Sequence, residues 1–120
     1  PPGTMDLFVE IGQCCRDADA FLAERRGVTS PMLRVRMFQQ GLEWTNRLQE
    51  LQGRVRSRGD AIEQDLRALN AAWEAAPPPG DGGRRAALPL DRLEDLYRAL
   101  SYVARWTEQI QERLVQLAAP

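Results

Sequence analysis

Apolar residues recur at spacings of three and four from Pro31 to Ala76, and this unbroken rhythm restricts the fold more than any other feature. It matches the helical period and predicts one helix over residues 31–76 with a stripe along one face. Gly59-Asp60 falls inside the stripe, but the phase continues through it and no proline accompanies the glycine. A turn at Gly59 is the alternative, which gives four helices instead of three. The stripe comprises Val35, Phe38, Leu42, Thr45, Leu48 or Gln49, Gln52, Val55, Gly59, Ile62, Leu66, Leu69, Trp73 and Ala76.

A first helix is predicted over residues 4–26, where the same spacing occurs. Thr4 is expected to cap its beginning, and Gly27 to end it in the left-handed conformation. Ser30 and Pro31 then restart the chain, because proline is well tolerated at the first helical position. The stripe comprises Phe8, Ile11, Cys15, Ala18 and Leu22, widened by Leu7, Cys14 and Phe21.

A loop is predicted over residues 77–88, where three prolines end the helix and three glycines follow. The third helix is expected over residues 89–118. Since β-branched residues are sparse and no strand-like alternation is sustained, the fold class is all-α. The third stripe comprises Leu90, Leu93, Tyr97, Leu100, Val103, Thr107, Ile110, Leu114 and Leu117.

The three helix lengths predict an elongated antiparallel bundle with coiled-coil packing. The first and third helices overlap only along residues 44–55 of the second, so each end would be a two-helix hairpin with apolar surface uncovered. A monomer rarely exposes a large contiguous apolar patch. We therefore expect residues 1–120 to be a single helical module, excised from a longer protein, that another helix covers.

The residue types argue against catalysis. All 16 basic residues are arginine, and lysine and histidine are absent. The chain thus lacks the Schiff-base nucleophile and the commonest general base and metal ligand. Its carboxylate pairs fall on polar faces, where solvated charge is the ordinary interpretation. We expect no catalytic residue, metal, cofactor or small-molecule substrate.

The charge pattern argues against binding to nucleic acid or membranes. The formal charge is −1, and Glu43 and Glu50 each precede an arginine by four residues, a spacing that supports exposed helix faces. No apolar run is long enough to cross a membrane, so a cytoplasmic or nuclear setting is expected. Cys14 and Cys15 are adjacent and diverge by about 100° on a helix, which disfavours a disulfide. We interpret both as core residues rather than a lipidation, metal or redox site.

The tryptophans are the candidates for contact with a partner. Trp73 lies on the second stripe and is expected in the core, whereas Trp44 lies on a flanking row and Trp106 beside the third stripe. Tryptophan is enriched at interface hot spots. The flanking row consists of Met37, Trp44, Leu48 and Leu51. The candidate partner-binding residues are Trp44, Leu48, Leu51 and Trp106.

The segments LEWTNRLQEL (residues 42–51) and LRALNAAWEAA (residues 66–76) resemble helices of spectrin repeats, in which a Leu-x-x-Leu-x-x-x-Trp rhythm recurs. The resemblance implies a three-helix antiparallel bundle that serves as a spacer or docking module in cytoskeletal, adaptor or exchange-factor proteins. It covers a small part of the chain. The two tryptophan segments also lie closer together here than in that family, on one predicted helix.

These observations predict a non-catalytic module that binds or spaces protein partners through helix-to-helix packing. One alternative is a self-associating bundle in which each copy supplies the helix that the other lacks. Another is a small all-α enzyme of the chorismate-mutase type, with arginine and glutamate side chains inside the bundle holding an anionic substrate.

Overall fold

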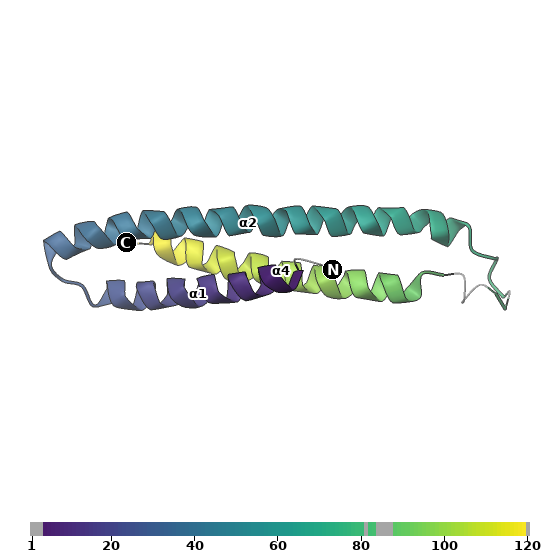
Figure 1. Ribbon diagram of the computed structural model, residues 1–120, viewed down its shortest axis with the longest axis horizontal. Coiled ribbons are helices and arrows are strands. Elements are labelled where there is room, and N and C mark those ends of the chain that lie inside the picture. Colours follow the sequence, from purple (N-terminus) through teal and green to yellow (C-terminus); the bar gives the residue numbers. More distant parts are fainter. Residues whose placement is uncertain (1–3, 81, 84–87, 120) are drawn as a thin grey trace. The chain divides into compact units, whose positions relative to one another are not determined.

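The computed structural model describes residues 4–80, 82–83 and 88–119, and in this part of the chain it contains three α-helices and no strand. They are α1 (Thr4–Arg26), α2 (Pro31–Glu74) and α4 (Leu90–Ala118) (Figure 1). The all-α class is confirmed. The four-helix alternative is wrong, because α2 continues through Gly59 without interruption. None of these helices combines the length and apolar character that a membrane span requires.

The charged residues at the ends of α1 are placed favourably, whereas Gly27 differs from its expected conformation. Asp6 in the first turn of α1 and Arg25 in its last turn both oppose the helix dipole. Gly27 was expected to adopt a left-handed conformation, but among the described glycines only Gly80 has a positive φ, of 93°. The turn after α1 closes instead through tight backbone bonds from Gly27 N to Glu24 O and from Val28 N to Arg25 O. This expectation was wrong because such bonds satisfy the last carbonyls without a left-handed residue.

The chain divides into two compact units. Unit 1 comprises Pro1–Val55 and Trp106–Pro120, and thus holds α1, the first part of α2 and the last part of α4. Unit 2 comprises Arg56–Arg105, with the second part of α2 and the first part of α4. Helix α2 therefore contributes to both units.

Unit 1 has a core built from all three helices. In α1 the expected residues are buried except Phe8, which is exposed and meets the ring of Trp106 edge to face, with centroids 6.1 Å apart. Arg113 of α4 donates two hydrogen bonds to the Asp19 carboxylate of α1, at 3.1 and 3.0 Å, and these raise the pKa of Arg113. The core comprises Leu7, Ile11, Cys14, Cys15, Ala18, Phe21, Leu22, Met37, Leu48, Leu51, Val55, Trp106, Ile110 and Leu117.

The first part of α2 presents a different face to this core than the stripe predicted. Val35, Phe38 and Leu42 were assigned to the core but are 61%, 68% and 52% exposed. The row that flanks them is buried instead. Gly41 lies in that row and faces the Phe21 ring of α1. A Cβ atom added at Gly41 would lie 3.8 Å from this ring. The row that contains Gly41 thus faces α1, and the expected register was wrong over residues 35–42.

Unit 2 contains two helical segments, and among its described residues the buried apolar side chains are those of Ile62 and Leu96. Gly59 sits where the two helices approach, since a Cβ at this position would lie 3.3 Å from Val103 Cγ1. Trp73 was expected in the core and is 41% exposed. Two helices bury only a narrow line of contact, so the outer residues of each stripe remain in solvent. Leu90 and Tyr97 of unit 2 were also assigned to the core and are exposed. In the α4 segment of unit 1, the predicted stripe residue Thr107 is exposed as well.

Candidate protein interaction surface

The four candidate residues from the sequence lie in unit 1 and contact other parts of the same chain. Leu48, Leu51 and Trp106 are buried. Trp44 is partly buried; its ring lies 6.4 Å from the Phe21 ring, and the Arg47 guanidinium lies 4.6 Å from its centroid. These contacts account for the burial of the four side chains within unit 1. A role for them in binding a partner stays a prediction.

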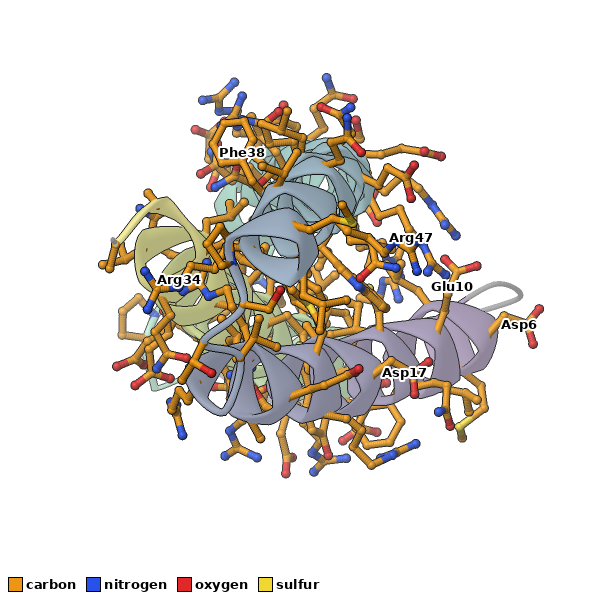
Figure 2. All side chains as sticks on the ribbon, turned by 90° about the vertical axis from the view of Figure 1, so that its left-hand side faces the viewer. Asp6, Glu10, Asp17, Arg34, Phe38 and Arg47 are labelled. Atoms are coloured by element: carbon orange, nitrogen blue, oxygen red, sulfur yellow. The ribbon has the colours of Figure 1, made fainter. Side chains whose placement is uncertain are left out.

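A different set of apolar side chains is exposed on the first part of α2. Val35, Phe38 and Leu42 are spaced by three and four residues, so they form one line along the helix, here called the α2 strip. At about 100° of rotation per residue, the three side chains fall within about 60° of one another. Figure 2 shows Phe38 on the side of α2 that faces away from α1. The strip therefore has the geometry of a helix-packing seam whose side chains remain largely in solvent.

Basic residues lie at the Val35 end of the α2 strip, whereas the exposed Glu43 follows Leu42 at its other end. The segment from Arg25 to Leu42 contains four arginines and no Asp or Glu, a formal charge of +4 in a chain whose total is −1. Arg34 and Arg36 are exposed and flank Val35 directly. Within the described ranges, no acidic side chain forms an ion pair with Arg26, Arg34 or Arg36.

Arg25, by contrast, has a structural role. Its guanidinium donates hydrogen bonds to the carbonyl oxygens of Leu117 at 3.1 Å, Gln116 at 2.8 Å and Ala119 at 3.4 Å. These carbonyls lie at the end of α4, where the helix dipole is negative and carbonyl groups lack helical partners. Arg25 thus ties the end of α1 to the end of α4.

A groove of about 770 Å³ opens beside the α2 strip, at the end of unit 1 where α1 turns into α2 and α4 ends. We call it the tip groove. Leu22, Met37 and Leu117 supply apolar lining, and Phe38 connects the groove to the strip. Arg25, Arg26 and Arg34 also line it, and no acidic residue does so. The groove therefore combines an apolar surface with positive charge.

Another groove of unit 1, between α1 and α2, has a different character. Asp6, Glu10 and Asp17 of α1 and Glu50 of α2 line it, together with two arginines. In Figure 2 the labelled Asp6, Glu10 and Asp17 follow α1, with Arg47 above them. Arg54 of α2 forms an ion pair with Glu10. The lining charges therefore favour binding of an anionic partner at the tip groove over binding at the groove between α1 and α2.

The residues that could carry covalent or metal chemistry are unfavourably placed. Cys14 and Cys15 are free and buried, and burial raises the pKa of both thiols above their usual range. A raised pKa keeps a thiol protonated, hence a poor nucleophile. Among the residues that the structure describes, no cluster of Cys, Asp and Glu could hold a metal ion.

Sequence reasoning placed the α2 strip in the core and so missed it as a surface. Two signals in the sequence could have identified it. The predicted stripe that contains the strip continues through the polar Thr45, Gln49 and Gln52, whereas the flanking row continues through the apolar Leu48 and Leu51. The uninterrupted positive charge from Arg25 to Leu42 is the second signal.

Comparisons with protein-family models, with curated proteins and with solved structures find no match to this chain.

Proposed function

We propose that this protein is a non-catalytic interaction module that binds a helix of a protein partner along the α2 strip. The observation that carries the proposal is the exposure of Val35, Phe38 and Leu42 at helix-packing spacing. Complete burial of one large apolar side chain is worth about 1.5–3 kcal/mol. Three such residues in one line contribute up to about 4.5–9 kcal/mol to the binding free energy, from which the cost of association is subtracted.

A spacer or docking role of this kind agrees with the resemblance to spectrin repeats. That resemblance rests on residues 42–51 and 66–76, and we include a spectrin-like bundle as part of the proposal. A cytoplasmic or nuclear setting belongs to it as well, since the free thiols of Cys14 and Cys15 agree with a reducing compartment.

The two alternatives differ in their support. Self-association could cover the same strip with a second copy, so it shares the observation above. An enzyme of the chorismate-mutase type would need charged side chains inside the bundle. Among the described residues, no polar or charged side chain is buried, so no specific observation favours an enzyme.

A designed amphipathic peptide tests the proposal. The peptide carries leucine at helix-packing spacing and glutamine at its remaining polar positions, so that apolar packing alone drives binding. We expect the double variant Phe38→Ser, Leu42→Ser to bind it at least about tenfold more weakly than the natural sequence, because both anchors are lost. Titration of a fluorescent peptide measures the affinity, and Gln39→Ser, an exposed change beside the strip, is the matched control.

Three results are informative. Loss of binding in the double variant but not in Gln39→Ser supports docking on the α2 strip. Equal affinity for all three proteins, or no binding at all by a monomeric chain, contradicts it. A dimer in sedimentation that dissociates in the double variant replaces it with the self-association alternative.

A further inference from the structure

The positive charge around the α2 strip lacks a counterpart within the described residues. Arg25 is engaged with the carbonyls at the end of α4. Arg26, Arg34 and Arg36 carry their charges beside exposed apolar side chains, with no acidic partner among the described residues. Like charges on one surface repel one another, and a partner with negative charge would relieve this repulsion.

Some of the chain's own acidic side chains are engaged elsewhere. Asp19 pairs with Arg113, Glu10 with Arg54, and Asp65 with Arg92. A second copy that pairs its α2 strip with this one would bring the same arginines into the contact, because a two-fold interface places the same surface on both sides. The counterpart is more readily supplied by a different protein.

We propose that the α2 strip and the tip groove bind an amphipathic helix that carries acidic side chains on both sides of its apolar face. This inference rests on the proposed function and adds the chemistry of the partner. The apolar face packs along Val35, Phe38 and Leu42, and one large apolar side chain of the partner enters the tip groove. Its carboxylates meet Arg34 and Arg36 beside the strip and Arg26 at the groove. Arginine suits this contact because its guanidinium binds carboxylates through two parallel hydrogen bonds.

The shape of the surface favours a helix over an anionic membrane. The exposed side chains of Met32, Val35, Phe38 and Leu42 fall within about 120° on the helix, which is the width of an apolar stripe that packs against another helix. The tip groove is also a concave site of limited volume, which suits a single protruding side chain better than lipid tails.

The experiment compares three peptides with one leucine pattern and different flanking charges. The first carries glutamate beside the leucines, the second lysine, and the third glutamine. On the natural sequence we expect the glutamate peptide to bind at least about tenfold more tightly than the glutamine peptide, and the lysine peptide more weakly than both. Added salt should weaken the glutamate peptide alone, because screening shortens the range of charge attraction.

Protein variants locate the effect. Arg34→Gln with Arg36→Gln should reduce the preference for glutamate over glutamine to about threefold or less, and leave the affinity for the glutamine peptide unchanged. Arg56→Gln with Arg105→Gln removes the same charge from exposed positions of unit 2 and is the matched control. All four positions are exposed, so circular dichroism should show unchanged helix content.

The outcomes separate this inference from the proposed function. Equal affinity for the glutamate and glutamine peptides, both lost with Phe38→Ser, overturns the acidic partner but leaves helix docking intact. Absence of binding to every peptide overturns both. Binding to vesicles that contain phosphatidylserine, lost with Arg34→Gln and Arg36→Gln in the absence of peptide binding, replaces the acidic helix with an anionic membrane. Dimers that require the same arginines replace it with a second copy.

Discussion

Leu48→Ala is expected to lower the free energy of unfolding by about 2–5 kcal/mol. Leu48 has no exposed surface and lies in the core of unit 1. Shortening its side chain removes apolar contacts and leaves a cavity that the surrounding helices fill only in part. Since small domains are stable by about 5–15 kcal/mol, the loss is large enough to measure easily. Urea denaturation followed by circular dichroism gives the value.

Leu42→Ala is the matched control for this prediction. It removes the same atoms from the same helix, but Leu42 lies on the α2 strip, and its expected effect is within about 0.5 kcal/mol. A loss at Leu42 as large as that at Leu48 would show that the strip is packed, and would remove the basis of the proposed docking surface.

Ala18→Asp is expected to destabilise unit 1 by about 3–5 kcal/mol, because it places an unpaired carboxylate where no solvent reaches. Ala18 is fully buried on the face of α1 that packs into the core. The carboxylate must either remain charged without hydrogen-bond partners or be protonated at the cost of a raised pKa. Thermal and urea denaturation at neutral pH should both show the loss.

Ala20→Asp provides the comparison for Ala18→Asp. Ala20 is exposed on the same helix two residues later, so the change should cost only the difference in helix propensity, below about 1 kcal/mol. If the two variants unfold at the same urea concentration, α1 is not packed as described. Partial recovery of Ala18→Asp at acidic pH is also expected, because protonation removes the buried charge.

The helices themselves were predictable from the sequence. The bounds of α1 agree with the expected residues 4–26, and α2 ends at Glu74, two residues before the expected Ala76. Pro77 explains the earlier end, because a proline ring disfavours the helical conformation of the residue before it, here Ala76. Continuity through Gly59 was predictable because a lone glycine costs about 1 kcal/mol in a helix, which packing can offset.

The face that α2 buries was not predictable from periodicity alone. Spacing determines that a segment is helical, but two apolar rows on one helix leave its rotation about the axis undecided. In the first part of α2 both rows exist, one through Phe38 and one through Leu48. The second row faces α1, where a Cβ at Gly41 would lie 3.8 Å from the Phe21 ring, and this arrangement depends on the position of another helix, which the pattern of one helix does not contain.

The candidate partner-binding residues were chosen from the sequence without knowing which face of each helix is buried. Trp106 was singled out because tryptophan often anchors interfaces, yet in this chain it is buried in the core of unit 1. Val35, in contrast, was assigned to the core and is exposed. Residue type indicates which side chains can bind a partner, whereas exposure decides which of them are available, and exposure is a property of the packed chain.

The rate of thiol labelling at introduced cysteines tests the central claim, that α2 buries one apolar row and exposes the other. Leu42→Cys and Leu48→Cys are compared in the natural sequence, whose Cys14 and Cys15 are buried and serve as an unreactive background. We expect Leu42→Cys to react with a maleimide at close to the rate of the unfolded chain. Leu48→Cys should react at least about 100-fold more slowly, because labelling there requires opening of the core. Fast labelling of Leu48→Cys together with protection of Leu42→Cys would contradict the account.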